Sequence, residues 1–134
     1  MCMLVLGAGL QGSACAYDLL QHPRVERVTV ADLKPDSIPA FINPYVGKRL
    51  ALLTLDVQDA AAVRAAVRGH DAVLNAAPYY FNLDVSRAAV DVGAHCADLG
   101  AISSRCGWRC GGGTGSRPHG SCSTTTTRPM ASAR

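Results

Sequence analysis

The chain has 134 residues, of which 49% are hydrophobic and 17% charged, so it suits one domain of ordinary size with its own core. No apolar run approaches the ~18 residues of a membrane span, and the first residues do not form a secretory signal, so we expect a cytoplasmic protein. Residues 1–100 hold eight Lys and Arg against ten Asp and Glu, whereas residues 101–134 hold five arginines and no acid. The net charge of +3 therefore describes a mildly acidic domain with a basic tail, which argues against nucleic acid as a partner.

The first half of the pattern alternates between strand and helix. Residues 3–6 form a continuous apolar run, which is typical of a strand covered on both faces. A helical pattern runs from Leu10 to Leu20 and ends before Pro23, and residues 27–32 predict a second strand. Three prolines within residues 34–48 predict a loop with room for a turn of helix.

The second half continues the alternation. We predict a strand at residues 50–55, an alanine-rich helix at 60–67 with an aspartate N-cap, and a strand at 72–77. A helix at 83–92 and a fifth strand at 95–99 follow. This order predicts an α/β fold of Rossmann type, with a doubly wound parallel sheet of strand order 3-2-1-4-5 and no sixth strand.

The loop between the first strand and the first helix carries a glycine pattern. Residues 7–12 read Gly-Ala-Gly-Leu-Gln-Gly, and G-x-G-x-x-G in this context is typical of dinucleotide binding. Gly7 allows the tight turn, Gly9 lets a pyrophosphate approach the backbone, and Gly12 lets helix and strand pack closely. The alternative is that these glycines only permit a turn.

Two further features support cofactor binding at this loop. The first helical N–H groups, at Leu10 and Gln11, would offer partial positive charge to phosphates. Asp32 closes the second strand, and its carboxylate would accept hydrogen bonds from ribose hydroxyls and repel a 2′-phosphate, which favours NAD. Lys34 could partly neutralise such a phosphate, so NADP remains a candidate. Asp56 closes the third strand, where it would approach the adenine edge or simply be a solvated turn residue.

A second motif ends the fourth strand. Residues 75–80 read Asn-Ala-Ala-Pro-Tyr-Tyr and lie across the topological switch point from the first strand, where ligands of open α/β sheets bind. Ala77 is small enough for a cofactor to pass close to the backbone, and Pro78 forces a sharp exit. Tyr79 and Tyr80 would stack or hydrogen-bond near a nicotinamide; alternatively, they pack on the edge of the sheet.

Together these motifs resemble the N-terminal domain of the saccharopine dehydrogenase family, in particular its lysine 6-dehydrogenase-like branch. The matching segments are residues 4–12, 30–32, 73–80 and 94–100. Members oxidise or reduce C–N bonds at the amino groups of amino acids with NAD or NADP. The resemblance implies that Gly7, Gly9, Gly12 and Asp32 bind the cofactor and that residues 77–79 line the nicotinamide side.

The resemblance ends at Ala101. Family members continue with another helix, a sixth strand and a large α+β domain that holds substrate and dimerises. Residues 101–134 are instead half Gly, Ser and Thr, with no hydrophobic period. We expect residues 1–100 to form the dinucleotide-binding domain and residues 101–134 to be disordered. The tail resembles GC-rich coding sequence read out of frame, which suggests a frameshifted or truncated product; sequencing the locus tests this.

The cysteines favour free thiols over disulfides. Cys2, Cys15 and Cys96 lie within apolar patterns, where cysteine behaves as a small hydrophobe. Four tail residues have donor atoms for zinc: Cys106, Cys110, His119 and Cys122. Their spacing is not that of a standard zinc knuckle, and the tail lacks apolar residues for a small zinc fold, so we expect no metal.

The leading hypothesis is the NAD(P)-binding domain of an amino-acid oxidoreductase, without catalytic competence of its own. A non-catalytic NAD-binding module and a poorly folded fragment are the alternatives. The fifth strand would form an apolar sheet edge through which the chain could self-associate.

Overall fold

The computed structural model describes residues 1–99. The expected disorder of the tail and the rejected zinc site both concern positions outside these residues. The proposed domain boundary at residue 100 also falls at their limit.

Five parallel strands form one sheet in the order β3-β2-β1-β4-β5, which confirms the predicted fold and strand order. The strands are β1 (Cys2–Leu6), β2 (Arg27–Asp32), β3 (Leu50–Thr54), β4 (Ala72–Asn75) and β5 (His95–Asp98). Leu6 pairs with Ala31 on one side and with Asn75 on the other, and Asn75 pairs with Asp98. The carboxyl ends of the strands therefore meet at one edge, where the motifs were expected to converge.

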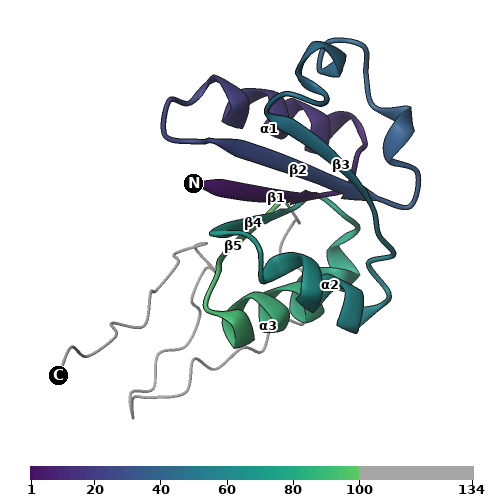
Figure 1. Ribbon diagram of the computed structural model, residues 1–134. Helices are drawn as coiled ribbons and strands as arrows, with labels where there is room; N and C mark the ends of the chain where they lie inside the picture. The colour runs from purple at the N-terminus through teal and green to yellow at the C-terminus, as the bar shows by residue number, and fades with distance from the viewer. Residues whose placement is uncertain (100–134) are drawn as a thin grey trace, which may run out of the picture.

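Helices cover both faces of the sheet (Figure 1). Helix α1 (Leu10–Gln21) lies on one face, and α2 (Ala60–Val67) and α3 (Asn82–Val92) lie side by side on the other. A hydrophobic core lies on each face of the sheet, and alternate strand residues point into one or the other. Val5 packs with α1, whereas its neighbours Leu4 and Leu6 pack with α2 and α3. This alternation follows from the period of two along a strand.

The connection between β2 and β3 has no α-helix. It contains 3₁₀ turns at Pro35–Ser37 and Asn43–Tyr45, as the prolines predict. Ile42 is fully buried in the same core as α1, and the Tyr17 ring meets Tyr45 edge to face at 5.8 Å. One buried isoleucine and this ring contact hold the loop against α1.

Three strands end earlier than the hydrophobic pattern predicts, by one residue in β3 and β5 and by two in β4. In β4 the pairing stops at Asn75, and Ala76 and Ala77 enter the following turn. Leu10, the first residue of α1, is 73% exposed and takes no part in the buried face of the helix. The His70 ring, just before β4, hydrogen-bonds with the Ala66 carbonyl at 2.7 Å and the Thr29 hydroxyl at 2.8 Å.

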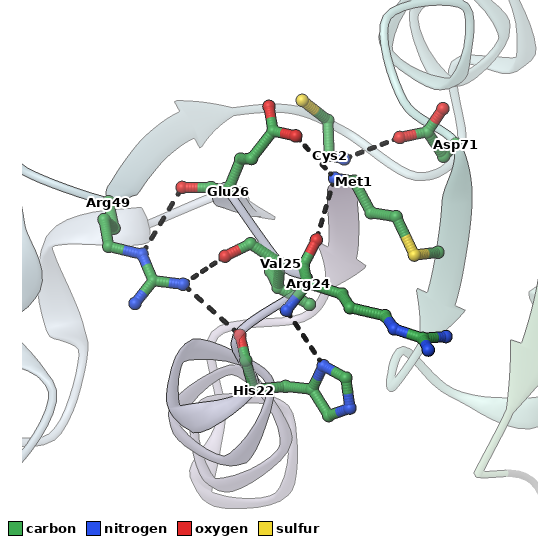
Figure 2. Close-up of polar contacts among 8 residues, drawn as sticks. All are labelled: Met1, Cys2, His22, Arg24, Val25, Glu26, Arg49 and Asp71. Carbon is green, nitrogen blue, oxygen red and sulfur yellow. Dashed lines mark hydrogen bonds and ion pairs between the residues drawn. The ribbon is translucent and has the colours of Figure 1, made fainter.

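The amino-terminal edge of the sheet is held by Arg49, which precedes β3. Its guanidinium donates hydrogen bonds to four main-chain carbonyls, and Figure 2 shows three of them. The acceptors are Leu20, His22, Val25 and Glu26. The end of α1, the entry to β2 and the start of β3 are thus joined through one side chain.

The start of the chain lies at the same edge (Figure 2). The Met1 amine donates to the Arg24 carbonyl at 2.9 Å and pairs with the Glu26 carboxylate at 3.1 Å. The Cys2 N–H donates to the Asp71 carboxylate at 2.7 Å. These contacts fix the start of β1 relative to β2 and β4.

Beyond α1, its face of the sheet leaves part of β4 and β5 uncovered. A groove of about 500 Å³ runs there, with Leu19, Leu74 and Ala97 among its apolar lining residues and Asp18 and His95 among its polar ones. β5 pairs only with β4 among the described strands, so its other backbone edge is unpaired within residues 1–99.

The cysteines of residues 1–99 are free, as expected. Burial raises the pKa of the Cys96 thiol, the hydrogen bond with the Ser86 hydroxyl opposes this shift, and the Asp98 carboxylate adds to it. Cys96 therefore remains a neutral thiol at neutral pH. Within residues 1–99, none of the helices has the length and apolar character that a bilayer crossing requires.

Candidate cofactor-binding site

Gly7 forms the turn from β1 to α1 with φ of +103°, a conformation that side chains strongly disfavour. Its N–H donates to the Ala31 carbonyl at 2.8 Å, which ties the turn to β2. A Cβ at this position would also lie 3.0 Å from the Ala76 carbonyl oxygen. Both the backbone angle and the β4 turn therefore require glycine here.

Gly12 lies in the first turn of α1, directly against Gly7. A Cβ on Gly12 would lie 2.0 Å from the Gly7 carbonyl oxygen, so the helix can approach the strand this closely only without a side chain. The next residue, Ser13, is fully buried and its hydroxyl donates to the Ala8 carbonyl at 2.9 Å. The glycine motif does not include Ser13; a small polar residue on an otherwise apolar helix face is the sequence signal that marks it.

Gly9 contrasts with the other two glycines. A Cβ built on Gly9 meets nothing within 4 Å, so the space beside this backbone is open. Gly9 is also the N-cap of α1, and its carbonyl accepts the Ser13 N–H at 2.9 Å. The N–H groups of the following residues, Leu10 and Gln11, have no acceptor within the helix and lie at its positive end. This open, positively polarised backbone fits a diphosphate.

Asp32 at the end of β2 contacts the glycine loop directly. One carboxylate oxygen accepts the Ala8 N–H at 2.7 Å, and the other accepts the Lys34 N–H at 3.0 Å. Each oxygen keeps a further lone pair for a ligand hydroxyl. The structure thus brings together the predicted acid and the predicted loop, and it adds a loop-holding contact that the sequence alone did not indicate.

The turn after β4 lies on the other side of the glycine loop. The Ala76 N–H donates to the Leu6 carbonyl at 2.8 Å, and the Ala77 nitrogen lies 3.3 Å from a Cβ built on Gly7. Pro78 then leads into a 3₁₀ turn at Tyr79–Phe81.

The two tyrosines of this turn are exposed. Tyr79 and Tyr80 are 59% and 63% accessible, and their rings meet edge to face at 5.6 Å. The alternative in which both pack down on the sheet edge does not match this exposure, and the rings remain accessible to a ligand.

Asp56 lies at the same edge of the sheet but farther along it. The Leu55 N–H donates to the Asp32 carbonyl at 3.0 Å, which places the end of β3 beside the end of β2. The Asp56 carboxylate accepts the Gln58 N–H at 2.8 Å and so closes its own turn. No described contact joins Asp56 to the glycine loop.

The carboxyl edge therefore combines an open backbone at Gly9, the start of a helix, a carboxylate and a turn of small residues. Along the edge, the Asp32 carboxylate at β2 is followed by the open backbone after β1 and then by the small residues after β4. Groups of these kinds suit a dinucleotide. Within residues 1–99, no cluster of side chains is suited to hold a metal ion.

Comparison with known proteins agrees with this geometry. Residues 3–126 match the family described as "Saccharopine dehydrogenase NADP binding domain". A saccharopine dehydrogenase [NADP(+), L-glutamate-forming] from Schizosaccharomyces pombe is 31% identical over 93 residues, which are 69% of this chain and 20% of that protein.

Solved structures share the fold of this chain. An apo saccharopine dehydrogenase (L-Glu forming) from Saccharomyces cerevisiae superposes with a TM-score of 0.65 at 25% identity, covering 77% of this chain and 22% of that one. A short-chain dehydrogenase/reductase from Veillonella parvula in complex with NADP shares the fold, with a TM-score of 0.58 at 15% identity over 72% of this chain and 46% of that one.

The chain spans about a fifth of the length of the saccharopine dehydrogenases that it matches. Its family match, its sheet order and its glycine loop all concern the same cofactor-binding unit. The chain therefore belongs to the saccharopine dehydrogenase NADP-binding domain family, and its cofactor is a nicotinamide dinucleotide.

Proposed function

We propose that this chain is the cofactor domain of an oxidoreductase acting on C–N bonds of amino acids, that it prefers NAD to NADP, and that alone it catalyses no turnover. The observation that carries the proposal is the Asp32 carboxylate, held 2.7 Å from the Ala8 N–H beside the open backbone of Gly9.

The preference for NAD rests on charge. A carboxylate at the end of β2 accepts hydrogen bonds from both ribose hydroxyls, but it repels the 2′-phosphate of NADP. Lys34 lies two residues away and is exposed, so it reduces this repulsion without removing it. The family and the Schizosaccharomyces pombe relative are named for NADP, so the preference would be a property of this chain's own residues.

We assign the roles of the remaining residues from their places along the carboxyl edge of the sheet. Gly9 and the N–H groups of Leu10 and Gln11 would hold the diphosphate, and Ala77 and Tyr79 would line the nicotinamide side. The nicotinamide group supplies the hydride chemistry when bound, and the chain positions it.

Catalysis needs a second wall that fixes the substrate and supplies an acid or base. The histidines within residues 1–99 do not meet this need, because all three lie toward the amino-terminal edge. His22 follows α1, His70 precedes β4, and His95 opens β5. The amino-acid substrate would therefore meet residues that the described part of this chain does not supply.

Titration with NADH and NADPH, followed by cofactor fluorescence, tests the binding site. We expect Gly9→Val to abolish binding, because its side chain would fill the space beside the backbone that a diphosphate needs. The fold should remain, since a Cβ there meets nothing within 4 Å. A folded Gly9→Val chain that binds NADH like the wild type would show that the diphosphate lies elsewhere.

Asp32→Ala tests the cofactor preference. We expect weaker NADH binding, because each lost charge-assisted hydrogen bond contributes ~1.5–3 kcal/mol. NADPH binding should fall less or improve, since the repulsion of the 2′-phosphate is also lost. An unchanged ratio of the two dissociation constants would remove Asp32 from cofactor selection.

Turnover assays with lysine and with saccharopine complete the test. We expect no hydride transfer above background with either substrate. Catalysis at an ordinary enzymatic rate would mean that this chain supplies its own substrate wall.

We also propose that the chain self-associates through the open side of β5.

A cytoplasmic location fits the free thiols of residues 1–99.

A further inference from the structure

Asn75 is a buried polar side chain at the carboxyl end of β4, with 1% of its surface exposed. Buried amides are costly unless they are hydrogen-bonded, and this one is. Its Oδ1 accepts the Ala77 N–H at 3.1 Å, and its Nδ2 donates to Oδ1 of Asn82 at 2.7 Å.

The first of these contacts determines the orientation of the amide. A main-chain N–H can only donate, so the Asn75 atom facing Ala77 must be the oxygen. The nitrogen therefore faces Asn82, and Asn82 must present an acceptor. One side chain thus joins the end of β4, the turn after it and the first residue of α3.

The main chain at this position makes equally specific contacts. The Asn75 carbonyl accepts the Leu99 N–H at 3.0 Å, which ties the end of β4 to the end of β5. The next residue, Ala76, bonds to Leu6, and its Cβ lies 3.3 Å from a Cβ built on Gly12. Asn75 therefore lies where the glycine loop, β5 and the β4 turn meet.

The segment between the two asparagines carries two exposed aromatic side chains. Residues 76–81 begin against the glycine loop and include both exposed tyrosines. Within this segment, the Ala77 N–H bonds to Asn75 and the Phe81 N–H bonds to the Pro78 carbonyl at 3.0 Å. The hydrogen bond between the two asparagines joins the two ends of this segment, at the end of β4 and the start of α3.

We propose that Asn75 and Asn82 are positioning residues that hold the 77–79 turn for the nicotinamide half of the cofactor. This inference rests on the proposed function. It predicts that the asparagine pair contributes to the binding of the nicotinamide half of the cofactor and not to the binding of the adenosine diphosphate half. The diphosphate and the adenosine ribose bind at Gly9 and Asp32, which the pair does not touch.

The experiment compares two ligands on the full chain by calorimetry. NADH contains the nicotinamide half, and ADP-ribose lacks only the nicotinamide ring. The variant is Asn82→Ala, which removes the acceptor at the start of α3 with little effect on helix propensity. The matched control is Asn82→Asp, which keeps an acceptor facing Asn75 and suits a helix N-terminus.

We expect Asn82→Ala to weaken NADH binding about tenfold, the effect of one lost hydrogen bond to a buried amide. ADP-ribose binding should change less than about twofold, and Asn82→Asp should keep wild-type affinity for both ligands. Should Asn82→Ala not fold, Asn82→Gln, which keeps an amide at a different reach, takes its place with the same expected split.

Three results would overturn the inference. The first is NADH binding by Asn82→Ala at wild-type strength, and the second is an equal loss of both ligands, which would indicate a general structural role. The third is a wild-type chain that binds neither ligand, which would overturn the proposed function as well. The first two leave the proposed function standing, so the failures are distinguishable.

Discussion

At the scale of single residues, Gly9 and Gly12 lie three positions apart but differ in the space around their Cα atoms. A Cβ on Gly9 reaches open space, whereas a Cβ on Gly12 would lie 2.0 Å from the Gly7 carbonyl oxygen. The motif predicts space for a ligand at Gly9 and close packing of helix on strand at Gly12, and the open backbone at one and the close approach at the other fit these two roles. Substitutions at the two positions should therefore separate binding from folding.

Gly12→Ala should lower the free energy of unfolding by about 1–3 kcal/mol or more, because helix α1 must move away from β1 to admit the methyl group. Gly9→Ala should leave stability within about 0.5 kcal/mol of the wild type, since it is a surface change. Urea unfolding followed by circular dichroism measures both. Equal stabilities for the two variants would contradict the close packing at Gly12.

At the scale of elements, the carboxyl and amino edges of the sheet differ in their contacts and in their proposed roles. The carboxyl edge carries the glycine loop, Asp32 and the β4 turn, whereas the amino edge carries Arg49 and the contacts of Met1 and Cys2 (Figure 2). Arg49 satisfies carbonyls at the end of α1 that have no partner within the helix. Its contribution should appear in stability and not in cofactor affinity.

Arg49→Ala should lower the free energy of unfolding by about 1–3 kcal/mol, because several charge-assisted hydrogen bonds are lost together. Arg49→Lys should recover little of this, since an ammonium group cannot reproduce the planar fork of a guanidinium. Thermal unfolding with and without NADH measures the effect. A stable Arg49→Ala chain with weakened NADH binding would reverse this division between the two edges.

At the scale of the whole molecule, the two faces of the sheet are unequally covered. α2 and α3 cover one face (Figure 1). On the other face, α1 leaves a groove of about 500 Å³ along β4 and β5. The groove lies next to the open edge of β5, and unpaired strand edges of this kind promote pairing with another chain.

We expect the apparent mass of the wild-type chain to rise with concentration in light scattering coupled to size exclusion. Ala97→Arg, which places a charge in the groove beside β5, should shift the chain toward monomer. Ala65→Arg, on the exposed side of α2, is the matched control and should have no effect. A wild-type chain that stays monomeric at every concentration would contradict self-association through this side.

Much of the fold and part of the site could be predicted from residue order. The apolar period separates strands from helices, the right-handed crossover rule then gives the strand order, and the glycine pattern with Asp32 marks the cofactor edge. Strand ends were less predictable, because the apolar run through Ala76 and Ala77 continues after the pairing of β4 has stopped. Leu10 fits the helical pattern equally well and is nevertheless exposed, because the buried face of α1 is formed by other residues: Gly12, Ser13, Ala16 and Leu20.

The sequence by itself determined the α/β class, the strand order and the position of the glycine loop after the first strand, because these depend on local periods and on residues a few positions apart. Only the tertiary structure decided which atoms meet across the sheet. Asp32 holds Ala8 across 24 positions, and His70 reaches Thr29 across 41. Asn75 faces Asn82 only because the strand, turn and helix close on one another. Such contacts depend on the register between strands and on the path of the backbone between them, and short-range residue patterns do not encode these distances.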